Sequence, residues 1–200
     1  MQIYKIKPLG FASNCYLVTE DGKTAVAVDP AQPRVLKRAQ ELGLAVKYVL
    51  LTHGHFDHIC GCAALQKAGA KVGCLEAEKG LALHCNLGME LGFGTRVPCF
   101  EVDFTFADED TLEFCGMSVK IIATPGHTAG SCCYLIGGAL FTGDTLFLND
   151  HGRTDLPTGS EAQMKDSLKR LAALAGDYPV YSGHGQNTTL EEERKWMLSI

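Results

Sequence analysis

The motif THGHFDH (52–58) directly follows the apolar stretch VKYVLL (46–51). That stretch is rich in strand-forming residues, so it predicts a buried strand that ends where the motif begins. At such a strand end, the two histidines of HGH point one way, while the following aspartate and histidine turn to the other side. Imidazole and carboxylate together suit zinc, iron or manganese, and the motif holds too many ligands for one tetrahedral ion. The sequence therefore predicts a metal site at the end of this strand.

Three shorter motifs repeat this arrangement later in the chain. Each places one histidine or aspartate in a glycine-containing turn just after an apolar strand. A lone histidine is more often a hydrogen-bonded structural residue, but five of the seven histidines occupy such positions, which is hard to explain without a metal. Glycine beside a ligand lets the backbone approach closely, because no Cβ atom crowds the site. The motifs are TPGHT (124–128), TGDT (142–145) and SGHG (182–185).

The rest of the chain alternates strand and helix patterns in two halves. The dipeptides Asp21-Gly22, Cys115-Gly116 and Gly137-Gly138 predict hairpin turns between neighbouring strands. Two sheets packed together, with helices outside, would bury all the apolar faces. Strands are expected within 3–10, 14–20, 23–29, 46–52, 71–76, 110–126, 131–144 and 178–185. Helices are expected within 34–43, 60–69, 76–92, 161–176 and 189–200.

Taken in order over residues 52–185, the motifs THGHFDH, TPGHT, TGD and SGHG resemble those of the metallo-β-lactamase superfamily. This resemblance implies an α+β fold in which residues 1–200 form a single four-layer αββα sandwich. It also implies a site on one edge of the sandwich for two divalent metal ions, with zinc expected and iron or manganese as alternatives. The implied ligands are His53, His55 and His127 for the first ion, Asp57, His58 and His184 for the second, and Asp144 as a bridge.

The same resemblance implies additional roles for three aspartates. Asp57 and Asp144 are the expected catalytic residues, because two ions roughly 3.5–4 Å apart can share a hydroxide at neutral pH. Asp29 matches a strand-end aspartate of the superfamily that supports the ligand loop from behind. The alternative for Asp29 is a turn residue before Pro30.

The segment GRTDLP (152–157) resembles the glyoxalase II branch of the superfamily, whose members hydrolyse hydroxyacylglutathione thioesters such as S-lactoylglutathione. Thioester hydrolysis suits the site, since a thiolate with a pKa near 8.5 leaves without a strong general acid. Arg153 is expected either to recognise an anionic substrate at the pocket entrance or to form an ion pair with Asp155. A similar segment occurs in persulfide dioxygenases, so a mononuclear iron enzyme using His53, His127 and Asp144 is the alternative.

One departure from full-length glyoxalase II concerns the end of the chain. Those enzymes carry a C-terminal helical domain that supplies cationic contacts to glutathione, whereas this chain ends at Ile200, soon after His184. It resembles the short, single-domain bacterial members, so the thiol carrier of the substrate is left open. The glycine-rich segment 80–94 is either a lid over the pocket or packing against the sheet, and packing is favoured. The remaining histidines, His84 and His151, have no role assigned by sequence.

Composition narrows the class of protein. The chain has 200 residues, of which 46% are hydrophobic and 20% charged, and its net charge is −5. These values predict a globular domain and give no electrostatic support for nucleic-acid binding. The start, MQIYKIKPLG, lacks a signal-peptide pattern, and no apolar run approaches the roughly 20 residues of a membrane span. A cytoplasmic enzyme acting on a small-molecule thioester, with no membrane or nucleic-acid partner, is expected.

The nine cysteines are an odd number, and reduced thiols are expected for a chain without a secretion signal. Cys60-Gly61-Cys62 is the only close pair beside the metal motif. It lacks CxxC spacing and a second pair at zinc-ribbon spacing, so small packing residues at a helix start are favoured over metal ligands.

Overall fold

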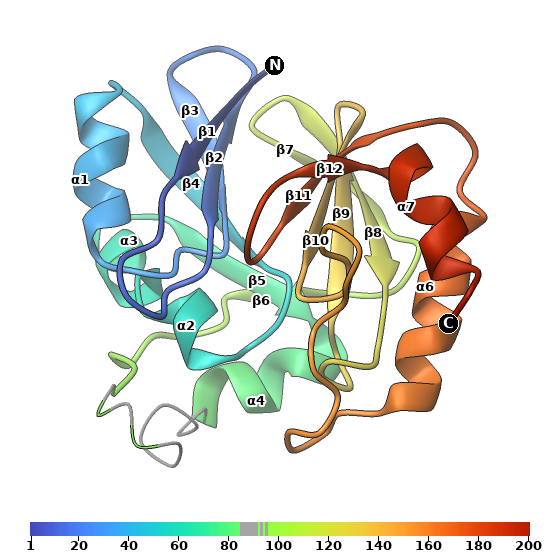
Figure 1. The fold of residues 1–200 in the computed structure, drawn as a ribbon. Helices are drawn as coiled ribbons and strands as arrows, with labels where there is room; N and C mark the ends of the chain where they lie inside the picture. Colours follow the sequence, from blue (N-terminus) through green and yellow to red (C-terminus); the bar gives the residue numbers. More distant parts are fainter. Residues whose placement is uncertain (85–91, 93, 95) are drawn as a thin grey trace.

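The computed structural model describes residues 1–84, 92, 94 and 96–200, and Figure 1 shows its two sheets packed face to face between layers of helices. The first half supplies β1 (Gln2–Ile6), β2 (Cys15–Thr19), β3 (Thr24–Val28), α1 (Arg34–Glu41), β4 (Ala45–Leu51), α2 (Phe56–Ile59), α3 (Cys62–Lys67), β5 (Lys71–Leu75), the 3₁₀ helix η1 (Glu76–Glu78), α4 (Lys79–His84) and β6 (Phe104–Phe106). The second half supplies β7 (Thr111–Phe114), β8 (Met117–Ala123), β9 (Cys132–Ile136), β10 (Ala139–Gly143), α6 (Glu161–Ala172), β11 (Pro179–Ser182), β12 (Thr188–Thr189) and α7 (Leu190–Met197).

Each sheet has six strands. The order is β1-β2-β3-β4-β5-β6 in the first sheet and β12-β11-β10-β9-β8-β7 in the second. The first is antiparallel over β1–β3 and parallel from β3 to β6. The second is antiparallel except for the parallel pair β10–β11. The fold is an α+β sandwich, as the sequence predicts.

Alternation along single strands explains why the central strands are apolar on both faces. In β2, Tyr16 packs between the two sheets, whereas Leu17 packs on the outer side of the first sheet. In β9, Tyr134 lies between the sheets and Cys133 faces the outer layer of the second sheet. Side chains of successive residues leave a strand on opposite faces, so a strand covered on both sides needs apolar residues throughout.

Two helical layers complete the sandwich. Val35 and Ala39 of α1 and Leu65 of α3 pack on the outer face of the first sheet. On the other side, α6 and α7 cover the second sheet with a row of buried side chains that includes Met164, Leu168, Leu171, Leu190 and Met197. The helix expected within 161–176 is confirmed as α6.

The three predicted hairpins are present, since β2–β3, β7–β8 and β9–β10 are antiparallel neighbours. At the second and third of these turns both residues have positive φ: 52° and 73° at Cys115-Gly116, and 52° and 82° at Gly137-Gly138. This is the twist that two-residue hairpins favour. Among the described residues, no helix is both long and apolar enough to span a membrane.

Four elements differ from the sequence-based expectation. The short strands β6 and β12 were not predicted, because three and two residues carry too little pattern. The motif after β4 continues into a helical turn, α2, rather than an open loop. Of the predicted helix 76–92, the structure forms η1 and α4 up to His84, and most of the remainder lies outside the described residues, as does part of the segment 80–94 considered as a lid.

Candidate metal centre

The seven residues that the sequence nominates as metal ligands meet at one edge of the sandwich. They come from four chain segments, which follow β4, β8, β10 and β11. Their ligand atoms fall into three overlapping groups, in each of which the atoms lie within 4.8 Å of one another. The groups are His53, His55 and His127; His53, His58 and Asp144; and Asp57, His58 and His184.

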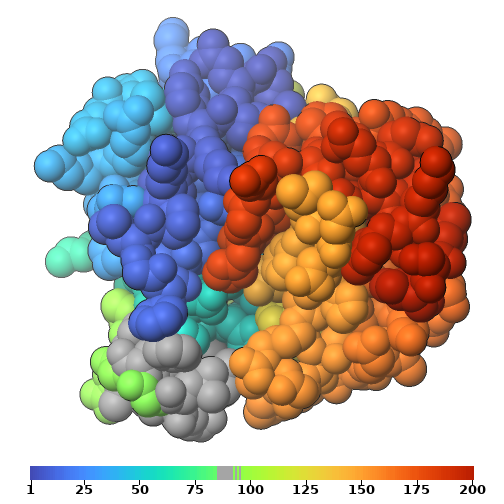
Figure 2. All heavy atoms as spheres, viewed as in Figure 1, coloured from blue at the N-terminus to red at the C-terminus, as the bar shows by residue number. Residues whose placement is uncertain are grey.

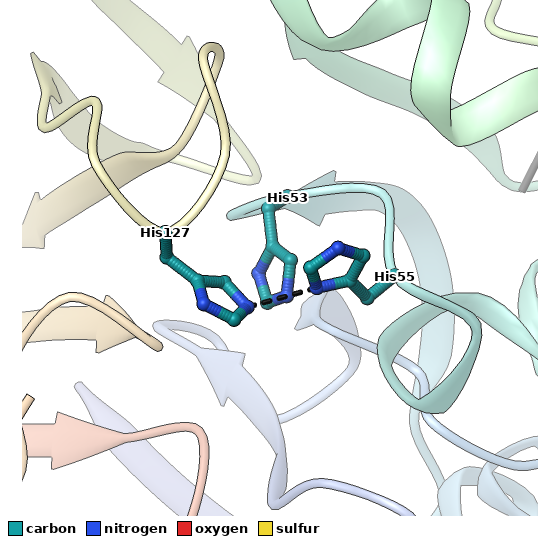
Figure 3. Close-up of side chains that lie close together, drawn as sticks. All are labelled: His53, His55 and His127. Atoms are coloured by element: carbon teal, nitrogen blue, oxygen red, sulfur yellow. Dashed lines mark hydrogen bonds between the residues drawn. The ribbon is translucent and has the colours of Figure 1, made fainter. Parts of the chain in front are cut away.

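The first triad consists of His53, His55 and His127, whose rings point toward a common centre (Figure 3). His55 Nδ1 lies 2.8 Å from His127 Nε2. The His53 ring is 4.8 Å from that of His55 and 4.7 Å from that of His127, measured between centroids. All three side chains are buried. The resemblance to the metallo-β-lactamase superfamily implies this grouping, and the structure brings the three residues together.

The second triad consists of Asp57, His58 and His184. It lies beside the first triad, and the Asp144 carboxylate is within reach of both. His184 Nε2 is 3.1 Å from Asp57 Oδ2 and 3.5 Å from Asp144 Oδ2. Asp144 Oδ2 is also 3.6 Å from His127 Nε2 in the first triad, while its other oxygen, Oδ1, is 3.3 Å from His58 Nε2. The Asp144 carboxylate therefore faces both triads, which is the position that a bridging ligand requires.

Asp29 fixes two of the imidazoles from behind. Its carboxylate accepts hydrogen bonds from the Thr52 backbone N–H at 2.8 Å, the Thr52 hydroxyl at 2.7 Å and His58 Nδ1 at 2.9 Å. Because the Thr52 hydroxyl hydrogen is donated to Asp29, its oxygen accepts from His53 Nδ1, 3.1 Å away. Both histidines are thus held through Nδ1, which directs Nε2 of each toward the centre. Asp29 therefore supports the ligand histidines, and it is more than a turn residue before Pro30.

His127 is oriented by the segment that the sequence links to substrate recognition. Its Nδ1 donates to the backbone carbonyl of Arg153 at 2.7 Å, which leaves Nε2 for the centre. The Arg153 side chain points elsewhere, and its Nε and Nη2 donate to the two carboxylate oxygens of Asp155, both at 2.7 Å. This pair is exposed at the cavity beside the metal centre. Of the two roles expected for Arg153, the structure shows the ion pair with Asp155. The contact of its backbone carbonyl with His127 is a role that sequence reasoning missed.

Orphaned polar atoms test whether these residues fit a metal. His53 Nε2, His58 Nε2 and Asp144 Oδ1 are buried and have no hydrogen-bond partner among the described residues. His58 Nε2 and Asp144 Oδ1 face each other at 3.3 Å without forming an aligned hydrogen bond. Leaving such atoms unsatisfied costs roughly 1–3 kcal/mol each. All three point into the same space, and imidazole nitrogen and carboxylate oxygen are ligands of zinc, iron and manganese. The residues fit a divalent metal.

The ligand residues of the site have pKa values shifted in opposite directions. Burial lowers the pKa of His53 well below its usual value, and burial followed by the nearby His127 lowers that of His55 to about 3. Burial acts the same way on His58, but Asp144, Asp29 and Asp57 outweigh it and raise the His58 pKa. Although burial opposes ionisation, His58 holds the pKa of Asp144 well below its usual range. His53 and His55 are therefore neutral and Asp144 is ionised, which are the protonation states that bind a cation, whereas His58 would release a proton when an ion binds.

Glycines make room for these contacts at two points. A Cβ atom on Gly183 would lie 2.2 Å from Asp144 Oδ1 and 2.8 Å from His58 Cε1. One on Gly143, whose φ is +50°, would lie 2.2 Å from the Thr52 hydroxyl. Both positions exclude a side chain, so the glycines next to the ligands are explained by close approach.

Glu78 of η1 is a buried residue that sequence reasoning missed. Its Oε1 accepts from the backbone N–H of Gly54, between His53 and His55, at 2.7 Å. Its Oε2 accepts from the hydroxyl of Thr128, next to His127, at 2.9 Å. One carboxylate therefore ties together the two loops of the first triad. Its signal in the sequence was an acidic residue shortly after the buried strand β5, within a segment whose glycines obscured the pattern.

Glu78 gives a prediction on pH and stability. Burial raises the pKa of Glu78 to about 7 from its ordinary value of 4.5. Between these values the folded chain binds a proton that the unfolded chain has lost, so the free energy of unfolding falls as pH rises through the window. In metal-free protein the advantage of the wild type over Glu78→Gln should fall by on the order of 1.4 kcal/mol per pH unit in that window. Denaturant unfolding at pH 5 and pH 8 with a chelator measures this, and a pH-independent difference contradicts it.

The cysteine pair beside the motif packs as expected. Cys62 is fully buried at the first position of α3, and burial raises its thiol pKa well above the usual value, which disfavours the thiolate that binds metals. Cys60 donates its thiol to the carbonyl of Phe56. Among the described residues, neither belongs to a group able to hold an ion.

We therefore expect a Cys60→Ala/Cys62→Ala variant to lose roughly 1–3 kcal/mol of stability, because the buried thiol leaves a cavity. Its metal content should equal that of the wild type and of a control, Cys99→Ala, whose side chain is exposed. Thermal unfolding and elemental analysis measure the two quantities. Stoichiometric loss of metal from the double variant would show that the cysteines are ligands.

A cavity of about 510 Å³ opens beside the two triads. Its walls are largely apolar, and ligand residues from both triads form its floor, together with Asp144. His151 is not among the lining residues. Its Nδ1 contacts the Gly152 carbonyl, and its ring lies 6.0 Å from that of Trp196. His84 is exposed at the end of α4. The lining residues are Pro8, Gly10, Phe11, Ala12, His55, Phe56, Asp57, His127, Asp144, Phe147, Gly152, Arg153, Leu156 and His184.

The fold, the order of the ligand motifs and the shared carboxylate define a class of metallo-hydrolases. The sequence pattern of the metallo-beta-lactamase superfamily matches residues 8–184, and the chain belongs to this superfamily. Within it, the chain is glyoxalase II-like. Hydroxyacylglutathione hydrolase GloC of Haemophilus influenzae is 33% identical over 203 residues, which cover 98% of this chain and 96% of that protein.

Solved structures agree with the assignment to the superfamily. The B3 metallo-beta-lactamase BLEG-1 superimposes with a TM-score of 0.90 at 28% identity, over 97% of both chains. The protein TTHA1623, solved in a di-iron-bound form, superimposes with a TM-score of 0.83 at 30% identity, over 95% of this chain and 96% of that one.

Proposed function

We propose that this protein is a hydrolase of thioesters of the hydroxyacylglutathione type, such as S-lactoylglutathione, and that it works with two divalent metal ions. The observation that carries the proposal is the Asp144 carboxylate, which directs Oδ1 toward His58 and Oδ2 toward His127 and His184. A carboxylate facing both triads suits a pair of ions rather than one. Zinc is the proposed metal, with iron supported as an alternative by the di-iron relative.

When bound, such ions polarise a carbonyl and lower the pKa of a bound water. The chain itself holds and orients the reactants. His53, His55 and His127 would hold the first ion, and Asp57, His58 and His184 the second. The Asp57 carboxylate also lines the cavity, and His58 and His184 outweigh its burial and lower its pKa. It is ionised at neutral pH and is placed to accept a hydrogen bond from the attacking water.

Departure of the thiolate makes few demands on the protein. A thiol with a pKa near 8.5 is a better leaving group than an alcohol or an amine, so a general acid near the sulfur is not required. The apolar walls of the cavity, including Phe56, Phe147 and Leu156, surround the thioester and limit competing water.

A panel of S-lactoyl thioesters, assayed beside elemental analysis, tests the proposal. We expect close to two ions per chain and thioester turnover that is the same with and without O₂. One iron per chain, with O₂-dependent consumption of glutathione persulfide, would replace the hydrolase by a dioxygenase that uses His53, His127 and Asp144. Metal binding without turnover of any thioester would overturn both.

A further inference from the structure

A second cavity, of about 560 Å³, is lined mostly by basic side chains. We call it the basic groove and define it by its lining residues: Lys5, Ile6, Lys7, Arg34, Lys37, Arg38 and Glu41. Only Glu41 is acidic, and it pairs with Arg38 at 3.1 Å. This concentration of positive charge occurs in a chain whose net charge is −5.

The groove lies between β1 and one face of α1, which are neighbours at the blue edge of the molecule in Figure 1. Arg34, Lys37, Arg38 and Glu41 follow helical spacing on that face, while Val35 and Ala39 are buried against the first sheet. The first turn of α1 holds no acidic residue, although the dipole of a helix disfavours cations there. A bound anion would relieve that repulsion.

Two lysines of the basic groove form no ion pair with another described residue. Among the described residues, Lys7 and Lys37 have no ion pair, whereas Arg34 donates to the Lys7 carbonyl and Lys5 Nζ donates to Gly185 O and Asn187 Oδ1, each at 3.1 Å. Clustered cations with planar guanidinium groups among them suit phosphate oxygens, which accept several charge-assisted hydrogen bonds at once.

The basic groove adjoins the cavity of the metal centre along the chain. Lys7 lines the groove, and its neighbour Pro8 lines the cavity together with Gly10, Phe11 and Ala12. The segment between them is apolar and exposed, with Leu9 at 60% and Phe11 at 65% exposure. Figure 2 shows the N-terminal part of the chain, in blue, beside the red-orange C-terminal part, in keeping with the Lys5 contact to Gly185, the residue after His184.

The cavity itself is poorly suited to an anionic carrier. Arg153 is the only Lys or Arg among its lining residues, and its guanidinium is already engaged by Asp155. The residues outside the described part of the chain contain no Lys or Arg. A carrier with carboxylates close to its sulfur, such as glutathione, would place them among apolar walls, where an unpaired charge is unfavourable.

We propose that the basic groove binds the phosphates of a nucleotide-bearing thiol of the coenzyme A type, whose neutral arm crosses residues 8–12 and places the thioester at the metal centre. The row of cations along the length of α1 suits several phosphates rather than one. This inference rests on the metal-dependent thioester hydrolysis of the proposed function, and it replaces glutathione, the thiol carrier named there, with a phosphorylated carrier.

The experiment compares three substrates with the same acyl group: S-lactoyl-coenzyme A, S-lactoyl-N-acetylcysteamine, which has a short neutral arm and no phosphate, and S-lactoylglutathione. The metal-loaded protein is assayed as wild type, as Lys7→Glu/Lys37→Glu and as a control, Lys165→Glu/Lys169→Glu. The control reverses two exposed charges on α6 that line neither cavity. Titration calorimetry with adenosine 3′,5′-bisphosphate measures the affinity of the groove for phosphates independently of thioester hydrolysis.

We expect the groove variant to raise KM for S-lactoyl-coenzyme A by at least about tenfold with kcat unchanged, since two attractive contacts become repulsive. KM for S-lactoyl-N-acetylcysteamine should not change, and bisphosphate binding should be lost. The control variant should match the wild type in every measurement. Added salt should weaken the binding of S-lactoyl-coenzyme A but not that of S-lactoyl-N-acetylcysteamine.

Different failures identify different errors. If the bisphosphate does not bind the wild type, or binds the groove variant equally well, the groove assignment is wrong. If S-lactoylglutathione is the preferred substrate and its kinetics are unchanged in the groove variant, the proposed coenzyme A-type carrier is wrong. The assignment as a thioester hydrolase would still hold. If no thioester is hydrolysed while groove-dependent bisphosphate binding persists, the groove stands and the proposed function is wrong.

Discussion

An Asp144→Ala variant is expected to lose hydrolytic activity and to bind both metal ions far more weakly than the wild type. Asp144 is the residue whose two oxygens are directed toward different triads, at 3.3 Å from His58 Nε2 and at 3.6 Å from His127 Nε2. Removing it takes one ligand from each ion and leaves imidazoles facing each other across an empty position. We expect kcat/KM to fall by on the order of 10³-fold or more, several kcal/mol of transition-state stabilisation.

The matched control for this variant is Asp155→Ala. Asp155 is also a carboxylate near the cavity, but it is exposed and pairs with Arg153 rather than with the triads. Elemental analysis after dialysis against a weak chelator, together with steady-state kinetics, compares the two variants. An Asp144→Ala protein that retains two ions would exclude the bridging role, whatever its activity.

Asp57→Ala is expected to remove one ion and keep the other. Asp57 lies 3.1 Å from His184 and belongs to the second triad only. Metal content should therefore fall from near two toward one per chain, with the first triad still occupied. Activity should fall by several kcal/mol in transition-state stabilisation, because a ligand and a Lewis acid are lost together.

This variant also separates the two reaction classes. In a mononuclear dioxygenase the residues of the second triad are only hydrogen-bond partners, so Asp57→Ala would leave the turnover close to that of the wild type. Full activity in the variant, or one iron and O₂ dependence in the wild type, would contradict the two-metal hydrolase. Cobalt substitution gives a second readout, since the visible spectrum reports the occupied triad independently of turnover.

The sandwich was predictable because its strands are buried on both faces and its hairpins carry strong turn residues. Strand β4 shows this at its carboxyl end, where Val49, Leu50 and Leu51 are apolar and fully buried. The seven residues that meet at the metal centre were also predictable, since ligand-type side chains follow four separate strands. Spacing alone could place these residues at strand ends, and the resemblance to known metallo-hydrolases supplied the grouping into two triads.

Contacts between distant backbone groups were not predictable. The Arg153 carbonyl that holds His127 has no signature in the identity of residue 153, because every residue carries a carbonyl. Glu78 depends on the packing of η1 against two loops that are separated from it by 24 and 50 positions. Arg153 itself stood out for its charge, whereas its backbone makes the contact within the site.

The Asp29 carboxylate has a consequence for how tightly ions can be held. Asp29 adopts φ of +50°, an uncommon conformation for a residue other than glycine, and in this position it reaches Thr52 and His58 together. His53 and His58 are thereby locked in orientation and in tautomer during folding. An arriving ion has little rotational freedom left to remove from them, a saving on the order of 0.5–1.5 kcal/mol per side chain in binding free energy. Affinity at this centre is thus set partly by a residue that never touches the metal.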